Sequence, residues 1–276
     1  MPCTIRLLTP DGLQPVPYTA DSLNDAAQYE PQDGVYTVTN TFDTYTVLKL
    51  TAHLDRLEDS ARRASIPLKL DRPRLRAALR EVITLAGCGD VRFRITVPAD
   101  QPDHYILSVE PFKPLAAAII ENGVRVITVP DSARVNAAAK TTGWMHERQK
   151  LESSLPAGIY TALLLDENGQ ILEGVSSNFY AIMEGALWTA DAGALPGIAL
   201  QIVLEVAPDV LPVKRDAVNV SAVPRLAEAF ITSASRGIVP VIEIDGHTLG
   251  DGKPGALTRQ LRERYTAAMQ KYLETL

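Results

Sequence analysis

Cysteine is scarce in this 276-residue chain, which contains only Cys3 and Cys88. Two cysteines are too few for a disulfide framework or for a cysteine-based metal site. The histidines have no ligand-like spacing to one another or to a cysteine, so we expect no bound metal. They are His53, His104, His146 and His247.

Long apolar runs and blocks of one charge are also missing. The longest uncharged stretches fall short of the roughly 18–20 apolar residues that a membrane-spanning helix needs. The first residues, 1–6, lack the apolar region of a secretory signal. The net charge is −6, with both signs interspersed and no basic block. We therefore expect a cytoplasmic protein that binds neither nucleic acid nor a membrane.

Familiar nucleotide and hydrolase motifs are absent or incomplete. The chain has no G-x-S-x-G sequence and no Walker A sequence. Residues 250–255 match G-x-G-x-x-G, but only 21 residues follow Gly255. A dinucleotide site needs a second strand after its helix, with an acidic residue about 20 positions on. The motif is therefore predicted to be a plain turn before the last helix.

What the sequence does have is ample core material and clear periodicity. Hydrophobic residues make up 46% of the chain and charged residues 22%, so nothing suggests disorder. Helical spacing predicts helices over 53–66 and 71–87, the second with Asp71 as N-cap and Gly87 as its stop. Residues 91–97 alternate apolar with polar, which predicts a half-buried strand.

The later elements are mostly strands. We expect a helix over 198–207 and another from about 254, with Tyr272 on its apolar face. The predicted strands cover 105–111, 124–129, 160–165, about 170–183, 186–189, 229–233 and 240–245. This order favours an α+β fold. The Pro- and Ala-rich passage near 115 divides it into a small N-terminal α/β domain, 1–115, and a larger strand-rich C-terminal domain, 116–276.

Three groups of segments carry the most specific information. The first joins D-G-V-Y-T (33–37) to H-L-D-R-L (53–57); the second joins A-A-K-T-T-G (138–143) to the E-G-V-S-S-N segment (173–178). The third contains L-P-G-I (195–198), F-I-T-S-A-S (230–235) and P-V-I-E-I-D-G (240–246).

Their order and spacing resemble the class IV aminotransferases, which are fold-type IV enzymes dependent on pyridoxal 5′-phosphate. That group includes branched-chain and D-amino acid aminotransferases, (R)-selective amine transaminases and aminodeoxychorismate lyase.

The resemblance implies a cofactor site. It makes Lys140, which lies among small residues, the catalytic Schiff-base lysine, and Glu173 the carboxylate that keeps the pyridine nitrogen protonated. For Glu173 the alternative is an exposed turn residue. Arg56 corresponds to the phosphate arginine, and a guanidinium suits that role. The remaining cofactor-binding positions are Asn178, Ile198, Ala199, Ala234 and Ser235. Ala199 lacks the hydroxyl of many relatives, so only its backbone N–H can contribute.

The substrate pocket departs from the better-known relatives. Tyr36 corresponds to an active-site tyrosine, but Met145 stands where branched-chain enzymes have a tyrosine. Val97-Pro98 replaces the Arg-Gly pair of D-amino acid enzymes. Candidates for a cation that binds a substrate carboxylate are Arg92, Arg94 and Arg236; the alternative for each is a surface ion pair.

The resemblance therefore predicts an aminotransferase that works by a ping-pong mechanism as a homodimer. Its substrates would be a small-molecule amino donor and a 2-keto acid. The alternative is a pyridoxal-phosphate lyase of the aminodeoxychorismate lyase type, which needs the same cofactor residues. The residues leave open whether the donors are L-amino acids, D-amino acids or amines.

Overall fold

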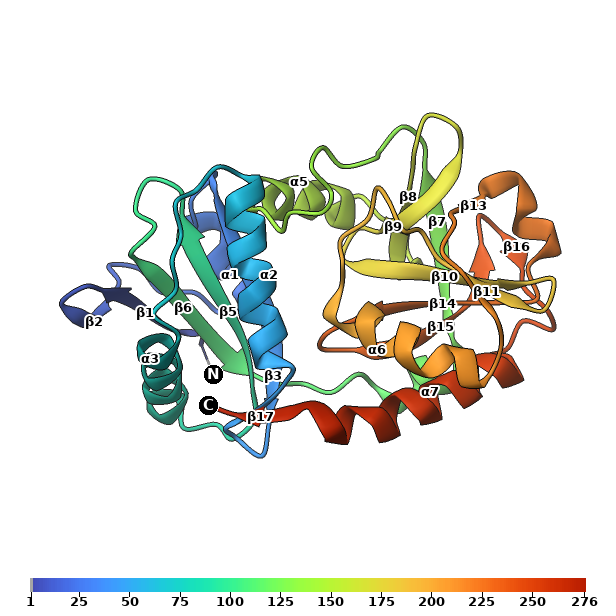
Figure 1. Cartoon of the computed structure of the whole chain (residues 1–276). Coiled ribbons are helices and arrows are strands. Elements are labelled where there is room, and N and C mark those ends of the chain that lie inside the picture. Colours follow the sequence, from blue (N-terminus) through green and yellow to red (C-terminus); the bar gives the residue numbers. More distant parts are fainter. Residues whose placement is uncertain (1) are drawn as a thin grey trace. The chain divides into compact units, whose positions relative to one another are not determined.

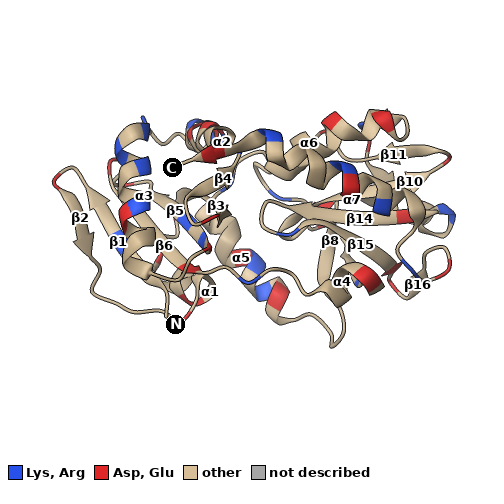
Figure 2. Ribbon diagram, turned by 90° about the horizontal axis from the view of Figure 1, so that it is seen from below, with Lys and Arg blue, Asp and Glu red and all other residues tan. Residues whose placement is uncertain are grey.

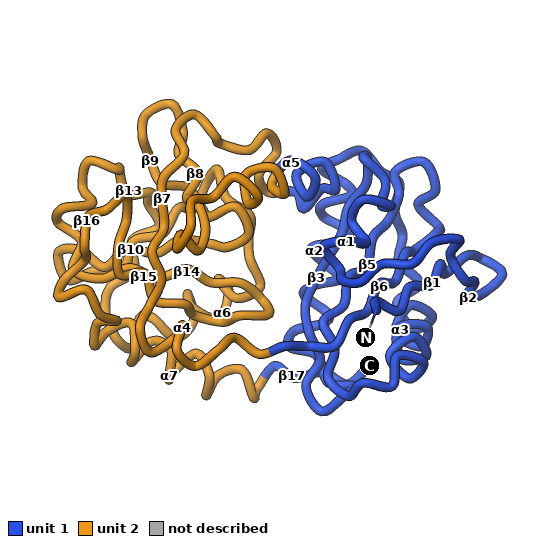
Figure 3. The backbone as a smooth tube through the Cα atoms, turned by 180° about the vertical axis from the view of Figure 1, so that it is seen from behind, with its two compact units in different colours: residues 1–113, 139–147, 272–276 blue, residues 114–138, 148–271 orange. Residues whose placement is uncertain are grey.

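The chain forms two compact units in the computed structural model, which describes residues 2–276 (Figure 3). Unit 1 comprises Met1–Lys113, Ala139–Glu147 and Tyr272–Leu276, and unit 2 comprises Pro114–Ala138 and Arg148–Lys271. The chain leaves unit 1 after Lys113, and two short segments beyond that point, 139–147 and 272–276, belong to unit 1. The division into two domains at residue 115 stays a prediction.

Unit 1 is built on a seven-stranded sheet with helices α2 (Leu50–Arg63) and α3 (Arg72–Ala86) (Figure 1). In sheet order the strands are β17 (Leu273–Thr275), β4 (Thr46–Leu48), β3 (Gly34–Phe42), β5 (Val91–Pro98), β6 (Tyr105–Pro111), β1 (Thr4–Thr9) and β2 (Gly12–Pro15). Leucines of α2 and α3 pack with Phe93 and Ile95 of β5 in one buried cluster. The short helix α1 (Leu23–Ala26) and the 3-10 turn η1 (Ala27–Tyr29) precede β3.

The two predicted helices of unit 1 are confirmed, with α2 lying three residues earlier in the chain than predicted, and the ends of α3 follow from local chemistry. The Asp71 carboxylate accepts a hydrogen bond from the N–H of Arg74 and caps α3. Gly87 ends α3 in the left-handed conformation, with a φ of 60°. Both α2 and α3 carry acidic and basic residues (Figure 2).

The prediction of a half-buried β5 is wrong. Val91, Phe93 and Ile95 face the core as expected, but the opposite face is covered as well. Arg94 and Thr96 on that second face are buried. The side chain that covers them is Glu30, which comes from a distant part of the sequence.

Unit 2 is dominated by strands, and six of them form a closed ring. The ring runs β10-β14-β15-β7-β8-β9 and returns to β10 through the β9–β10 pairing. Its strands are β7 (Val124–Val129), β8 (Thr161–Leu165), β9 (Gln170–Gly174), β10 (Ser177–Met183), β14 (Glu228–Ser233) and β15 (Gly237–Ile244). Short strands extend it: β11 (Ala186–Trp188), β12 (Val213–Lys214), β13 (Val218–Asn219) and β16 (His247–Thr248). The predicted strands are confirmed to within a few residues, and the α+β class is confirmed.

The helices of unit 2 differ more from expectation. The expected helix near 198–207 is α6 (Ile198–Val206), and the last helix is α7 (Ala256–Met269). Tyr272 lies beyond α7, in the 3-10 turn η4 (Gln270–Tyr272), so its placement on the helix face is wrong. The sequence did not indicate α4 (Ala117–Asn122) or α5 (Thr142–Ser153), and α5 belongs partly to each unit. The 3-10 turns η2 (Ala207–Asp209) and η3 (Val220–Arg225) complete the unit.

None of the helices within residues 2–276 combines the length and the apolar character that crossing a bilayer requires.

The G-x-G-x-x-G segment leads into α7, and its chemistry is that of a helix cap. Both carboxylate oxygens of Glu228 accept N–H groups from the first turn of α7, at 3.1 Å from Leu257 and 2.7 Å from Thr258. A Cβ on Gly255 would lie 1.9 Å from the Glu228 carboxylate carbon, so a larger residue there would displace the capping carboxylate. The helix start is therefore occupied by a side chain of the protein itself.

We predict that Glu228→Ala destabilises unit 2 by about 1–2 kcal/mol, because two N–H groups lose their acceptor. Urea unfolding measures the change in the free energy of unfolding. Glu184→Ala removes a carboxylate from an exposed ion pair with Arg225 and serves as the control, with a change below about 1 kcal/mol. Equal stability of the two variants would contradict the capping role.

Candidate active site

Lys140 is held in unit 1 by both of its backbone groups. Its N–H donates to the Ser60 hydroxyl at 3.0 Å, and its carbonyl accepts from the N–H of Tyr36 at 3.0 Å. The next residue, Thr141, forms an isolated antiparallel bridge with Val35. The side chain then places Nζ 4.5 Å from the centroid of the Tyr36 ring. A lysine on the surface of a loop would have none of these constraints.

Small residues allow this close approach. Ala139 is fully buried beside Lys140, so a larger side chain could not be accommodated there. A Cβ on Gly34, just before the bridging strand residue, would lie 2.5 Å from the carbonyl oxygen of Val97. The glycine of the D-G-V-Y segment is therefore a packing requirement of β3 and not a sign of flexibility.

Helix α2 presents a buried polar face toward this region, made by His53, Arg56 and Ser60. Their spacing of three and four residues puts them on one side of the helix. The Thr37 hydroxyl lies 2.8 Å from Nδ1 of His53 and 3.5 Å from Nη2 of Arg56. Because a guanidinium only donates, Thr37 accepts the hydrogen bond from Arg56. Nε2 of His53 is buried without a partner among the described residues.

Burial changes the acidity of both side chains. The pKa of His53 lies well below its usual value because burial disfavours the charged ring, and the charges of Arg56 and Lys140 add to the effect. Burial likewise lowers the pKa of Arg56 to about 10, partly opposed by Tyr36. At neutral pH His53 is therefore neutral and Arg56 remains a cation.

In unit 2 the predicted cofactor carboxylate, Glu173, is fixed at the end of β9. Nε of Arg134 donates to one carboxylate oxygen at 2.7 Å, and the N–H of Leu195 donates to the other at 3.0 Å. Both charged side chains are about 5% exposed or less. Glu173 is therefore not the exposed turn residue that the sequence leaves as an alternative. A buried ion pair of this kind keeps the carboxylate in one orientation.

Asn178 connects Glu173 to the start of α6. It lies opposite Glu173 in the β9–β10 pairing and opposite Thr232 in the β10–β14 pairing. Its amide donates to the carbonyl of Leu195 at 2.8 Å, so Leu195 is held from both sides. A Cβ on Gly197 would lie 2.1 Å from the Asn178 side-chain oxygen, which explains the glycine.

Helix α6 begins at Ile198 with no capping side chain, although Ile198 and Ala199 are both buried. Backbone N–H groups in the first turn of a helix have no partner within that helix. The start of α6 therefore presents unsatisfied donors and the positive end of the helix dipole, in contrast to the capped α3 and α7. This is the character of an anion-binding helix start.

The remaining predicted residues of unit 2 occupy the turn between β14 and β15. Ala234, Ser235 and Arg236 are half-buried there. The N–H of Arg236 donates to the carbonyl of Ser233 at 3.3 Å and closes the turn. Through β14, this turn adjoins the strand that carries Asn178.

The other two arginine candidates already have carboxylate partners. Arg92 lies 3.3 Å from Glu110 and its side chain is 41% exposed. Arg94 is buried and donates to Glu30 through both Nε and Nη2, while Thr96 donates to the second oxygen of Glu30. Both arginines extend from the same face of β5, as the alternation predicts. Glu30 occupies the side of the guanidinium that a substrate carboxylate would need.

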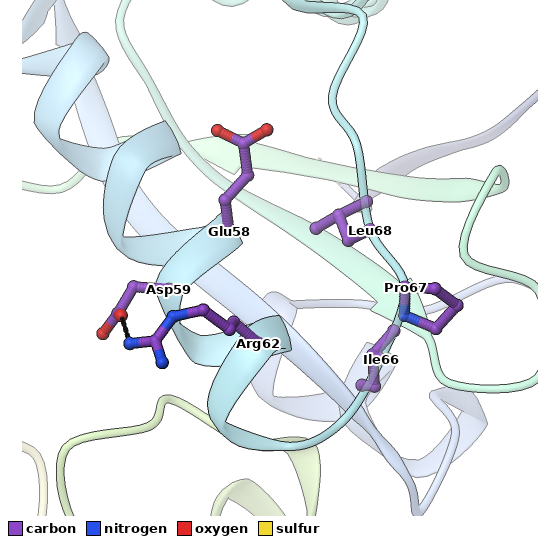
Figure 4. A pocket seen from close by; sticks show the side chains of 6 residues that line it. All are labelled: Glu58, Asp59, Arg62, Ile66, Pro67 and Leu68. Carbon is purple, nitrogen blue, oxygen red and sulfur yellow. Dashed lines mark hydrogen bonds and ion pairs between the residues drawn. The ribbon is translucent and has the colours of Figure 1, made fainter.

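A surface pocket also lies in unit 1, but on the other side of α2 (Figure 4). It is lined by Glu58, Asp59, Arg62, Ile66, Pro67 and Leu68. Its charged side chains are paired locally, Arg62 with Asp59 and Glu58 with Arg72. None of the residues predicted to hold the cofactor lines this pocket.

The structure thus brings the predicted residues together in two groups. Lys140, Arg56 and Tyr36 are neighbours in unit 1, while Glu173, Asn178, Ile198, Ala199, Ala234 and Ser235 belong to unit 2. Sequence reasoning missed several residues that fix them, namely Thr37, His53, Ser60, Arg134 and Glu30. The signal for His53 and Ser60 was their helical spacing from Arg56, whereas Arg134 and Glu30 gave no local signal.

Comparison with known proteins identifies a family. Residues 34–244 match the family model described as Amino-transferase class IV. A putative branched-chain-amino-acid aminotransferase of Methanocaldococcus jannaschii is 27% identical over 260 residues, which cover 87% of this chain and 88% of the relative. A D-alanine aminotransferase of Staphylococcus haemolyticus is 27% identical over 259 residues, covering 88% and 89%.

The fold is shared with solved structures. The branched-chain aminotransferase of Thermoproteus uzoniensis, solved with norvaline, superposes with a TM-score of 0.82 at 21% identity. The match covers 100% of this chain and 99% of that chain. Further branched-chain aminotransferases of this fold were solved with pyridoxamine 5′-phosphate and with a phosphopyridoxyl derivative of glutamate.

We predict that Glu30→Gln destabilises unit 1 by about 3–5 kcal/mol, because it leaves the buried Arg94 cation without its carboxylate. The double variant Glu30→Gln/Arg94→Met should recover much of that loss, since it removes the stranded charge. Denaturant unfolding of both variants measures the effect. Asp59→Asn, in an exposed ion pair on α2, is the control and should cost below about 1 kcal/mol. A Glu30→Gln variant as stable as this control would contradict the burial of the pair.

We also predict an acid-sensitive contribution from His53. Its pKa is lowered in the folded state, so below pH 6.5 the unfolded chain binds a proton that the folded chain excludes. Stability therefore falls as the pH decreases below about 6.5, by at most about 2 kcal/mol between pH 6.5 and 5. His53→Asn can still form a hydrogen bond with Thr37 but does not titrate, so its unfolding free energy should decline less over this range. Parallel pH profiles for the two proteins would rule out this assignment.

Proposed function

This chain belongs to the class IV amino-transferase family, whose members depend on pyridoxal 5′-phosphate, and we propose that Lys140 is the lysine that bonds to the cofactor. The enzyme transfers an amino group from an amino acid or amine to a 2-keto acid. The donor would leave as a keto acid before the acceptor keto acid enters the same site, which makes the mechanism ping-pong. The observation that carries this proposal is the attachment of residues 139–142 to β3 and α2 by both backbone groups of Lys140.

The residues present fit the chemistry of this cofactor. When bound, pyridoxal 5′-phosphate supplies a carbon that takes up the amino group and a ring that withdraws electrons from it. The phosphate requires a fixed cation and several N–H donors. Arg56 is a buried cation, and the uncapped start of α6 offers the N–H groups of Ile198 and Ala199. Ser235 adds a half-buried hydroxyl.

Glu173 has the properties that the pyridine nitrogen needs. A carboxylate beside that nitrogen keeps it protonated, and the protonated ring is the stronger electron acceptor. The bonds from Arg134 and from the N–H of Leu195 fix the orientation of Glu173. Asn178 acts through Leu195 and is assigned here as a positioning residue.

Lys140 also moves the proton. In the first half-reaction Nζ would take a proton from the substrate Cα and deliver it to the cofactor carbon that takes up the amino group. In the second it would move a proton in the opposite direction, to the Cα of the new amino acid. An amine can take up a proton only while it is neutral, and the resulting ammonium group then gives the proton up. Lys140 is half-buried with Nζ over the face of Tyr36, and the charges of Lys140 and Arg56 both act on His53.

The names of the relatives indicate the substrate class. We infer from the branched-chain and D-alanine aminotransferases among them that the donor side chain is small or medium-sized and apolar. The surroundings of Tyr36 are also apolar, since Tyr36 and Met145 are buried together with Ala27 and Val38 packs against them.

The experiment is a panel of L-amino acids, D-amino acids and (R)-amines, each with pyruvate and with 2-oxoglutarate. Transfer that depends on the keto acid supports the proposal and identifies the donor. Release of pyruvate from aminodeoxychorismate without any keto acid would instead establish a lyase. We also propose a homodimer, which light scattering of the purified protein tests, and the cytoplasmic location stays a prediction.

We predict that Lys140→Ala lowers transamination by at least about 10²–10⁴-fold, because the chain then lacks both the cofactor attachment and the proton carrier. It should also lose the visible absorbance of the bound cofactor. Lys150→Ala, an exposed lysine on α5, is the matched control and should keep both. Full activity in Lys140→Ala would refute the assignment.

A further inference from the structure

Arg236 differs from the other arginine candidates in the hydrogen-bond partners of its guanidinium. Its Nε donates to the Ser233 hydroxyl at 2.8 Å and its Nη1 to the Tyr160 hydroxyl at 3.3 Å. Nη2 donates to the carbonyl and hydroxyl oxygens of Ser176 at 3.0 and 3.1 Å. These three partners come from three different parts of unit 2, so the guanidinium has one defined orientation.

All of these partners are neutral. Arg92 and Arg94 each pair with a carboxylate, but no acidic side chain within residues 2–276 forms an ion pair with Arg236. The guanidinium is half-buried, so part of its hydration is lost without a compensating negative charge. Burying a charge without a partner is unfavourable, and a bound anion removes that cost.

The hydroxyls around Arg236 reinforce the preference for an anion. Each accepts a hydrogen bond from the guanidinium, which cannot itself accept one. The hydrogens of the Ser176, Tyr160 and Ser233 hydroxyls therefore remain available, and they reach no acceptor in the described part of the chain. A fixed cation surrounded by hydroxyl donors matches the needs of a carboxylate or phosphate oxygen.

The cluster adjoins residues of the proposed cofactor site. Ser176 lies within the E-G-V-S-S-N segment, between Glu173 and Asn178, and Arg236 directly follows Ser235 in the β14–β15 turn. An oxyanion here could come from the substrate or from the cofactor phosphate. The phosphate already has Arg56 and the start of α6 as proposed partners, which leaves the Arg236 cluster for the substrate.

We propose that Arg236, with the Ser176 and Tyr160 hydroxyls, binds a carboxylate of the amino acid and of the keto acid. This inference rests on the proposed function and deepens it, because it makes the enzyme selective for carboxylate-bearing substrates over plain amines. Arg236 is then a specificity residue: it acts on substrate binding and not on the proton transfer at Lys140.

Calorimetric titration of the cofactor-loaded protein with butanoate, an unreactive carboxylate, tests binding apart from turnover. Arg236→Gln should raise the Kd for butanoate by about 10- to 100-fold, the usual effect of losing a charge-assisted hydrogen-bond pair. Arg236→Lys keeps the charge but loses the planar guanidinium, so its Kd for butanoate should lie between those of the wild type and Arg236→Gln. Arg225→Gln, an exposed arginine of the same unit, is the matched control and should leave the Kd unchanged. Thermal unfolding confirms that each variant is folded.

Two further measurements identify the source of the anion. Arg236→Gln should raise the KM for keto acids while the rate with a simple alkyl amine donor in single turnover stays the same. Unchanged butanoate binding would overturn the proposal, and so would a loss of pyridoxal 5′-phosphate affinity in place of carboxylate affinity. Butanoate binding that depends on Arg236 supports the site even in a protein that transaminates nothing, a result that would contradict only the proposed function.

Discussion

The organisation of this protein depends on the way the backbone of Lys140 is bound. Residues 139–147 belong to unit 1, although the chain on either side of them belongs to unit 2. Two hydrogen bonds hold this segment in unit 1. The N–H of Lys140 donates to the Ser60 hydroxyl, and the N–H of Tyr36 donates to the carbonyl of Lys140. Three features of the neighbouring elements accompany this arrangement: a glycine before Val35, buried alanines before the lysine, and a buried polar face on α2.

Each unit then uses the same device to hold a buried carboxylate. Glu30 is fixed by Arg94 and Thr96, and Glu173 by Arg134 and a backbone N–H. The consequences differ because the surroundings differ. Glu30 completes a structural ion pair beneath the sheet of unit 1, whereas Glu173 stands at a strand end beside an uncapped helix. Buried charge is therefore evidence of function only together with unsatisfied donors nearby.

The sequence predicted those features whose causes are local. Helix α3 was predicted to the residue at its cap and stop, since Asp71 and Gly87 act within one turn. The burial of Arg94 was not predicted, because its partner Glu30 lies 64 residues away in the sequence. Helix α5 was missed because only Thr142 and Met145 are buried, which leaves no apolar period. The roles of Lys140, Arg56 and Glu173 were predicted from the motif resemblance. The residues that position the groups around them, Thr37, Arg134 and Leu195, have partners that are distant in the sequence, so only the folded structure reveals them.

Locating the covalent attachment of the cofactor tests the account most directly. Purified protein loaded with pyridoxal 5′-phosphate is reduced with borohydride, digested, and mapped by mass spectrometry. We predict a phosphopyridoxyl group on the peptide that contains Lys140, with the other lysines unmodified. Modification of Lys113 or Lys150 instead, or of no single lysine, would contradict it.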